Sequence, residues 1–585
     1  MQQDGKEIWM VQTKRADFKG LAQKLGVSPV SVRIMRNRGL ETEEAMRRYL
    51  YGTADDLYDG SRMTDMERAS EILMEKLKSG KRIRVIGDYD IDGVCSSYLL
   101  LTGLRRVSEA LSGTKGRIDY EIPDRIADGY GMNERMIRQA SSDQVDTLVT
   151  CDNGIAAAKE IRLAGELGMT VIVTDHHEIP VDEEGNQVLP PAAAVVDPKR
   201  KGDSYPYPEI CGAVVVYKLL QLLYRRAEVP EAEWKELLQF AAVATVGDVM
   251  RLQDENRLIV KYGLRQLAGT RNLGLRCLAE KNGLDMGRLS AYHIGFVIGP
   301  CLNAGGRLQT AKLALRLLQA DTREEAERLA EELKELNDLR KDMTAKGEAE
   351  AIRQVEERYA KDKVLVVFLP ECHESLAGII AGRVREHFHK PAFVLTKSQE
   401  SAADGMAKGS GRSIEAYHMF QGLCQVSDLL PKFGGHPMAA GLSVREADIG
   451  ELRRRLNENA ELTEEDFIPR IWIDVPMPFE YASEELVREL ERLEPFGQGN
   501  EKPLFAQKDL WIKSARVLGK NRNVVRLSLA AENGFPIEGI LFGDGDEFMS
   551  RQAESSRIDV TYYPDINEYN GNRTLQAVIK NYKLH

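Results

Sequence analysis

The sequence lacks the features that mark several classes of protein. No run approaches the ~18 apolar residues of a membrane-spanning helix, so neither such a helix nor a membrane partner is expected. The start, MQQDGKEIWM, has no basic stretch followed by an apolar run, so no signal peptide is expected. The 7 cysteines form no C-x-x-C pair, which argues against a disulfide framework or a cysteine zinc site and favours a reducing cytoplasm.

Two catalytic signatures and an excess of basic residues are also missing. The sequence contains no G-x-x-x-x-G-K-[ST] phosphate loop and no H-E-x-x-H zinc helix. No phosphate-loop ATPase or helicase is therefore indicated. The formal net charge is −11, so a nucleic-acid partner would have to be held by local basic patches.

The composition and the pattern of the first half predict an α/β protein. The 585 residues are 43% hydrophobic, which is enough for several globular domains. From residue 65, short β-branched runs alternate with helical stretches, a pattern typical of a parallel sheet. The predicted elements are a helix over 66–78, strands over 82–87, 146–150, 170–174 and 193–196, and a helix-like run over 237–247.

The rest of the chain divides into three patterns. Residues 1–64 are mixed and mostly helical, and Leu and Met recur at steps of three and four over 321–360, which predicts a long amphipathic helix. That helix either covers a core or rigidly connects two globular units. The run VLVVFL (364–369) opens a second α/β unit that extends to about residue 460. Beyond it, short alternating runs predict a small β-barrel or sandwich.

Acidic residues recur where the predicted strands end. They stand in Gly87-Asp88-Tyr89-Asp90-Ile91-Asp92, Cys151-Asp152-Asn153, Asp175-His176-His177 and Asp197-Pro198, and at Asp248 after the helix-like run. Ligands bind beyond the carboxyl ends of strands in an open parallel sheet, so these side chains are expected to converge. So many carboxylates repel one another unless cations neutralise them.

The convergence of these residues predicts a metal centre. Asp90 and Asp92 point the same way in an extended segment, and with Asp152, His176 and Asp248 they can hold two divalent cations ~3.5–4 Å apart. Each motif alone has a plainer interpretation, because an Asp after a strand commonly caps the next helix. It is the combination of the motifs that favours the metal.

These motifs resemble those of a known superfamily. The four acidic motifs resemble the motifs of the DHH phosphoesterases, and GGHPMAAG (434–441) resembles the signature of their partner domain, DHHA1. Their order and spacing are similar to those of the single-strand-specific exonucleases of the superfamily, over about residues 65–585. The resemblance implies five segments: an N-terminal extension (1–64), a DHH catalytic domain with a parallel sheet (65–320), a connecting helix (321–362), a DHHA1 substrate-binding α/β domain (363–462) and a C-terminal OB-fold β-barrel (463–585).

The resemblance also implies roles for individual residues. It makes Asp90, Asp92, Asp152, His176 and Asp248 the ligands of two Mn²⁺ or Mg²⁺ ions, with Asp152 bridging them. Asp88, Asp175 and His177 are the remaining catalytic candidates. His177 would lie near the scissile phosphate, for transition-state stabilisation or proton transfer.

A second set of residues is expected to bind the substrate. The resemblance suggests a terminal-phosphate pocket formed by Arg125, Arg307, Ser410 and Arg412, with further substrate contacts from Asn303, Gly434, Gly435 and His436. Glycine-rich loops admit phosphate oxygens to backbone N–H groups and arginine adds a bidentate fork. An ordinary glycine turn with a solvated arginine is the alternative at each place. Residues 511–526 hold five basic residues, no acid and Trp511, as expected of a single-strand-binding OB-fold.

The resulting hypothesis is a processive 5′→3′ exonuclease. It would release 5′-mononucleotides from single-stranded DNA by two-metal hydrolysis, in recombination and repair. The resemblance implies a single-strand-binding protein and a RecQ-type helicase as partners, and a monomer is expected. Two alternatives remain: a short-oligonucleotide or cyclic-dinucleotide phosphodiesterase or pyrophosphatase of the same superfamily, and a catalytically inactive DNA-binding scaffold.

Overall fold

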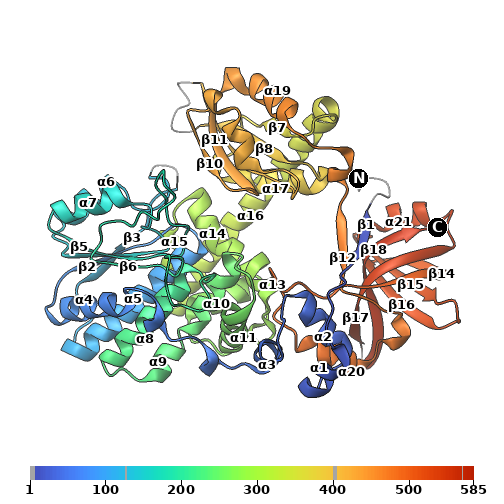
Figure 1. Ribbon diagram of the computed structural model, residues 1–585, viewed down its shortest axis with the longest axis horizontal. Coiled ribbons are helices and arrows are strands. Elements are labelled where there is room, and N and C mark those ends of the chain that lie inside the picture. Colours follow the sequence, from blue (N-terminus) through green and yellow to red (C-terminus); the bar gives the residue numbers. More distant parts are fainter. Residues whose placement is uncertain (1–6, 126–127, 399–404, 570) are drawn as a thin grey trace. The chain divides into compact units, whose positions relative to one another are not determined.

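The computed structural model describes residues 7–125, 128–398, 405–569 and 571–585, and it divides into two units (Figure 1). The larger unit is Thr53–Phe467, and the smaller unit joins the described residues up to Gly52 with Ile468–His585. Residues 1–6, on which the signal-peptide expectation partly rests, lie outside the described residues. Among the described residues, no helix combines the length and the apolar character that a bilayer crossing requires.

A five-stranded parallel sheet forms the base of the larger unit, as predicted. Its strand order is β3-β2-β4-β5-β6. The strands are β2 (Ile83–Ile86), β3 (Ile118–Glu121), β4 (Thr147–Cys151), β5 (Thr170–Thr174) and β6 (Ala194–Val196). Strand β3 was not predicted, because it is a partly exposed edge strand with the mixed sequence IDYE rather than a β-branched run.

Helices cover both faces of this sheet, so alternate residues of its strands enter two separate cores. Val149 faces the core built with α4, α5 and α8, whereas Leu148 faces the core built with α6 and α7. The covering helices are α4 (Met66–Lys78), α5 (Ile91–Ser112), α6 (Glu134–Ser142), α7 (Ala158–Glu166) and α8 (Gly212–Arg226). Further helices follow: α9 (Glu231–Lys235), α10 (Leu238–Gly247), α11 (Asp254–Leu267), α12 (Leu273–Lys281), α13 (Ala291–His293), α14 (Gly299–Leu308) and α15 (Lys312–Leu318).

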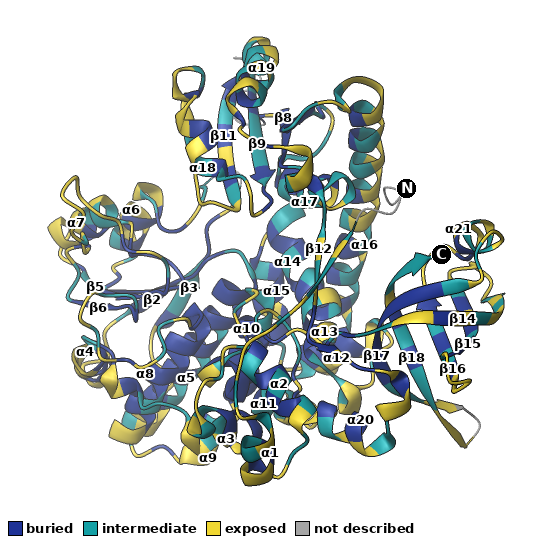
Figure 2. Cartoon of the chain, turned by 45° about the vertical axis from the view of Figure 1, so that its right-hand side comes forward, coloured by how far each residue is buried: buried dark blue, intermediate teal, exposed yellow. Residues whose placement is uncertain are grey.

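The long helix α16 (Arg323–Gln354) both covers a core and connects two sheets. Leu329 and Leu333 are buried in the core of the first sheet. Farther along, Ala351 and Val355 are buried against the second sheet. Leu339, between these two sets, is 51% exposed, so the leucine pattern is buried in part (Figure 2). Both interpretations of the helical pattern are therefore correct.

The second sheet of the larger unit mixes parallel and antiparallel strands, in the order β10-β11-β9-β8-β7. Its strands are β7 (Leu365–Phe368), β8 (Ala392–Lys397), β9 (Met406–Arg412), β10 (Lys432–Gly435) and β11 (Ala439–Arg445). The helices packed with it are α17 (Ala377–Phe388), α18 (Met419–Cys424) and α19 (Ile449–Asn459). This α/β unit was predicted from the run at 364–369.

The smaller unit is a closed barrel, which decides between the predicted barrel and sandwich. Strand β14 pairs with both β15 and β17, and this double pairing closes the ring. The ring strands are β14 (Phe505–Leu518), β15 (Val524–Ala530), β16 (Pro536–Phe542), β17 (Arg557–Tyr569) and β18 (Asn572–Leu584). The remaining elements after Ile468 are β12 (Arg470–Ile473), β13 (Val475–Pro476), α20 (Glu484–Glu491) and α21 (Gly545–Gln552).

The N-terminal segment packs on this barrel, an association that the sequence did not predict. Helices α1 (Phe18–Leu25), α2 (Pro29–Asn37) and α3 (Glu43–Tyr51) share its hydrophobic core, and β1 (Ile8–Val11) pairs with β12 in parallel. Arg38 forms a buried ion pair with Asp474. The hydroxyl of Tyr49 donates to the carbonyl of Leu493 (2.9 Å).

Candidate active site

The first acidic motif lies where β2 ends and α5 begins. Asp90 caps α5: its Oδ1 accepts hydrogen bonds from the N–H groups of Asp92 and Gly93, both 3.0 Å. A Cβ at position 93 would lie 2.5 Å from the carbonyl oxygen of Asp88, so only glycine fits there. Asp90 thus caps the helix and also belongs to the converging carboxylates, so the two interpretations of the motif do not exclude each other.

The start of α8 holds Asp92, the last acid of this motif, in place. The N–H groups of Gly212 and Ala213 donate to the two carboxylate oxygens of Asp92, at 2.7 and 2.8 Å. A Cβ at position 212 would lie 2.8 Å from the Cβ of Asp152, which follows β4 in a left-handed conformation (φ 60°). The sequence interpretation missed Gly212, although a glycine that opens an apolar helix was a usable signal.

The acidic side chains converge on His176. Its Nε2 lies 3.1 Å from Oδ1 of Asp152, 3.5 Å from Oδ2 of Asp92 and 3.8 Å from Oδ2 of Asp248. Three groups of side chains bring one ligand atom each to within 4.8 Å of one another. They are Asp152-His176-His177, Asp92-His176-Asp248 and Asp88-Asp90-Asp152. We call Asp88, Asp90, Asp92, Asp152, His176 and Asp248 the acidic cluster.

The electrostatics of the acidic cluster fit bound cations. Burial, with the charges of Asp92 and Asp90, raises the pKa of Asp152 and of Asp248 well above their ordinary values. Burial and the charge of Asp90 raise the pKa of Asp88 to about 8, and its Oδ1 is buried with no hydrogen-bond partner among the described residues. Because burial lowers the pKa of His176, its imidazole is neutral, the form that binds metals. Oxygen donors with one imidazole suit Mn²⁺ and Mg²⁺.

His177 points from the same loop but has a different environment. Its Nδ1 is 2.7 Å from Oδ1 of Asp175, and its side chain is 42% exposed. Burial opposes its protonation, but the hydrogen bond and charge of Asp175 outweigh it and raise the pKa of His177 to about 9. Asp175 also accepts from the N–H groups of Ile155 (2.9 Å) and His176 (2.8 Å), which fixes it in place. The hydroxyl of Tyr130 lies 3.2 Å from Nε2 of His177.

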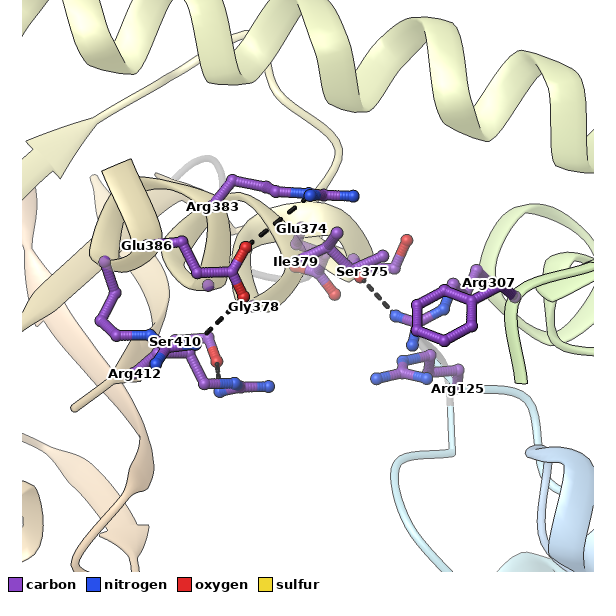
Figure 3. A pocket seen from close by; sticks show the side chains of 13 residues that line it. Arg125, Arg307, Glu374, Ser375, Gly378, Ile379, Arg383, Glu386, Ser410 and Arg412 are labelled. Atoms are coloured by element: carbon purple, nitrogen blue, oxygen red, sulfur yellow. Dashed lines mark hydrogen bonds and ion pairs between the residues drawn. The ribbon is translucent and has the colours of Figure 1, made fainter. Parts of the chain in front are cut away.

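Arginine side chains line a cavity of about 570 Å³ in the same unit (Figure 3). Arg125 and Arg307 lie on one side of it, and Ser410 and Arg412 of β9 on the other. Burial and the charge of Arg125 lower the pKa of Arg307 to about 10, and burial with the charge of Arg385 lowers that of Arg412. We call this the arginine cavity. Its other lining residues, not predicted from the sequence, are Phe296, Glu374, Ser375, Gly378, Ile379, Gly382, Arg383, Arg385 and Glu386.

Tyr89 connects the arginine cavity to the acidic cluster. It stands between Asp88 and Asp90, and the guanidinium of Arg125 lies 4.7 Å from its ring centroid. A Cβ at Gly306 would lie 2.4 Å from the Tyr89 carbonyl oxygen, so α14 packs directly on this residue. Next to Gly306, Arg307 donates to the carbonyl of Ser375 at 2.9 Å. The arginine cavity and the acidic cluster therefore share Tyr89 as a neighbour.

The remaining predicted substrate residues lie outside the cavity lining. Asn303 is on α14 one turn before Arg307, half-buried, with its Oδ1 unpartnered. Gly434 and Gly435 form the end of β10, where Gly434 pairs with Gly441, which itself pairs with Ser410. His436 is exposed in the following turn. These three residues are thus two strands from Ser410 and do not line the cavity.

Comparison with known proteins shows the family. The models of the DHH family N-terminal domain, the DHHA1 domain and the RecJ OB domain match residues 82–245, 361–462 and 473–581. The single-stranded-DNA-specific exonuclease RecJ of Escherichia coli is 32% identical over 579 residues, 94% of this chain and 95% of that protein. This chain belongs to the RecJ family. The RecJ of Bacillus subtilis is 36% identical over 575 residues, 98% of this chain and 70% of that protein.

Solved RecJ structures have the same fold and contain metal. RecJ from Thermus thermophilus in complex with Mn²⁺ matches with a TM-score of 0.81 and 28% identity, covering 98% of this chain and 79% of that one. Its complex with Mg²⁺ matches with a TM-score of 0.76 and 27% identity, covering 98% and 78%. The predicted fold class, DHH and DHHA1 domains with a C-terminal OB barrel, is therefore confirmed.

Proposed function

We propose that this chain is a metal-dependent exonuclease specific for single-stranded DNA that acts in recombination and repair. The observation that carries the proposal is the junction at Tyr89, where an acidic cluster suited to cations meets a cavity suited to phosphate. A phosphodiester backbone is the polymer whose charge suits both sites. The single-stranded-DNA-specific activity of the RecJ relatives supports the same conclusion.

Two divalent cations, Mn²⁺ or Mg²⁺, would be held by the ligands predicted from the sequence. Asp152 belongs to two of the three ligand groups, which suits the bridging position, and Asp88 belongs to one of them. When bound, the cations activate water and neutralise the charge that develops on the phosphate. The carboxylates would hold them, and the N–H groups at the start of α8 fix Asp92 in place.

His177 would act on the substrate directly, and Asp175 would position it. With a pKa of about 9, the imidazole is protonated at neutral pH and can donate a proton or a hydrogen bond to the leaving oxygen. Asp175 is buried and fully hydrogen-bonded, so it orients and charges His177 without contacting substrate.

The arginine cavity would hold the phosphate at the strand end. Charge-assisted hydrogen bonds from arginine favour the dianion of a terminal phosphate over the single charge of an internal linkage. Capture of an end accounts for exonuclease rather than endonuclease action. The 5′→3′ direction, processivity and release of 5′-mononucleotides are carried over from the family resemblance, as are the further contacts of Asn303 and of Gly434 to His436.

The remaining expectations are part of the same proposal. The domain boundaries would be 65–320, 321–362, 363–462 and 463–585 after an N-terminal extension. The enzyme would be a cytoplasmic monomer that works with a single-strand-binding protein and a RecQ-type helicase.

In the smaller unit, the outer surface of β14 presents Trp511 with the guanidinium of Arg557 4.2 Å from its ring centroid, which suits a strand-binding OB barrel.

A digestion with Mn²⁺ tests the function. The substrates are one single strand labelled at its 5′ end, the same strand labelled at its 3′ end, and a blunt duplex. Immediate release of a labelled mononucleotide from the 5′ end, with the duplex intact, is the expected result. Cleavage confined to di- to tetranucleotides would instead identify a short-oligonucleotide phosphodiesterase, and no cleavage with intact strand binding would identify a scaffold.

A further inference from the structure

Two aromatic side chains are exposed together beside the arginine cavity. Tyr292 is 64% and Phe296 69% exposed, and their rings stack with centroids 4.9 Å apart and planes 26° apart. They stand four residues apart, so they occupy one helix face. Phe296 also lines the arginine cavity.

The aromatic pair belongs to the helical segment that carries Arg307. This segment runs through α13, a π-helical turn at Ile294–Ile298 and α14. π-Helical turns are rare in proteins, but those that occur are frequently found at functional sites. Along the segment, Arg307 stands at one end, Phe296 in the π-helical turn and Tyr292 at the other end. Phe296 is therefore part of the cavity lining, and Tyr292 stacks on it from the same helical segment.

We propose that Phe296 and Tyr292 form a stacking platform for the bases of the strand whose phosphate occupies the arginine cavity. This proposal rests on the proposed function and adds a pair of residues that would bind the substrate. Nucleic-acid bases are the occupant that the surroundings favour, because the apolar rings continue directly into a phosphate-binding surface, and a strand carries apolar base faces next to its phosphates.

The platform would also help to exclude duplex. Inside a duplex, both faces of each base are covered by its neighbours in the stack, so beyond the terminal pair an exposed ring finds no free face. An unpaired strand can turn its bases out onto Phe296 and Tyr292. Stacking tolerates any base, which suits an enzyme that degrades strands of any sequence.

An abasic scan combined with Phe296→Ala tests the platform. The substrates are 5′-phosphorylated single strands, either intact or with one abasic position at nucleotide one, two or three. Wild type should lose ~5- to 150-fold in kcat/KM when the stacked base is missing. Phe296→Ala should show that loss on the intact strand and little further loss on the corresponding abasic strand. Phe296→Trp, which keeps a ring, should retain the activity.

Controls separate this inference from the proposed function. Tyr481→Ala removes an equally exposed ring (67%) in the smaller unit and should leave the scan unchanged. The same strands are also compared by anisotropy in EDTA, so that binding is measured without cleavage. If wild type binds strands but does not cut them, the nuclease fails while the binding scan still decides the platform. If Phe296→Ala and wild type respond alike to all three abasic positions, the platform is wrong.

Discussion

The acidic cluster and the arginine cavity are alike in construction and opposite in charge. In the first, burial and like charges raise the pKa of Asp152 and Asp248; in the second, they lower the pKa of Arg307 and Arg412. Both therefore concentrate groups of like charge, and in the cavity Glu386 pairs with Arg383 and Arg385. A structural pair behaves differently: buried Lys218 and Glu255 neutralise each other. Uncompensated charge thus marks the places where a ligand supplies the opposite charge.

Removing one carboxylate from the acidic cluster gives the largest expected effect. Asp152→Asn should lower the rate of strand hydrolysis by roughly 10³-fold or more, because this carboxylate is shared by two ligand groups. Strand binding in EDTA should remain measurable. Full hydrolysis by the variant would contradict the metal assignment.

Removing one charge from the arginine cavity gives a smaller effect of another kind. Arg412→Ala should raise KM for a 5′-phosphorylated strand by roughly 10- to 100-fold, because hydrogen bonds to a charged group are lost. It should also abolish the preference for a 5′-phosphate over a 5′-hydroxyl. Arg454→Ala, an exposed arginine paired with Glu451 and Glu458, is the control and should change neither value. An unchanged end preference in Arg412→Ala would count against the cavity.

The charge of His177 should make the rate of strand hydrolysis depend on pH. The hydrogen bond and charge of Asp175 raise the pKa of His177, so the rate should fall on the alkaline side as His177 loses its proton. Asp175→Asn removes the charge that sustains the raised pKa, so the fall should move to lower pH. Rates measured from pH 6 to 10 check this. An alkaline limb at the same pH in both proteins would show that another group causes it.

The smallest effect is a pH-dependent stabilisation by metal. A carboxyl whose pKa is raised in the folded state, such as Asp88 at about 8, stabilises below its unfolded pKa, and the contribution is lost as the pH rises through 8. The metal-free protein should therefore lose stability from about pH 4 to pH 8 on this account. Mn²⁺ replaces the protons, so the rise in Tm that it causes should grow with pH. At 100 times Kd it corresponds to ~2.7 kcal/mol. A rise in Tm that does not change with pH would contradict the exchange of protons for Mn²⁺ in the acidic cluster.

Much of the first sheet and the acidic cluster could be predicted from the sequence. The β-branched runs fixed four of the five strands, and the carboxyl ends of parallel strands meet at one edge. Asp90, Asp152 and His176 were therefore expected to converge before any coordinates. Edge strand β3 could not be predicted because its sequence mixes polar and apolar residues.

The arginine cavity could not be predicted in the same way. Arg125 and Arg412 are far apart along the chain, in different α/β layers, and no periodicity links them. Only the resemblance to a family paired them in one pocket; the further substrate contacts that it suggested, at Gly434 and His436, lie outside the cavity lining. Phe296 was not singled out, because aromatics at helical spacing, here Tyr292 and Phe296, are more commonly part of a core.

The sequence by itself determined the local patterns: which runs become strands, which acids follow them, and that a long helix begins near residue 321. These follow from propensity and hydrophobic period, which act between near neighbours. The tertiary structure alone decided that Tyr89 joins the acidic cluster to the arginine cavity, and that α1–α3 share the core of the barrel. Such contacts depend on shape and packing between segments distant in the chain, which no local pattern encodes.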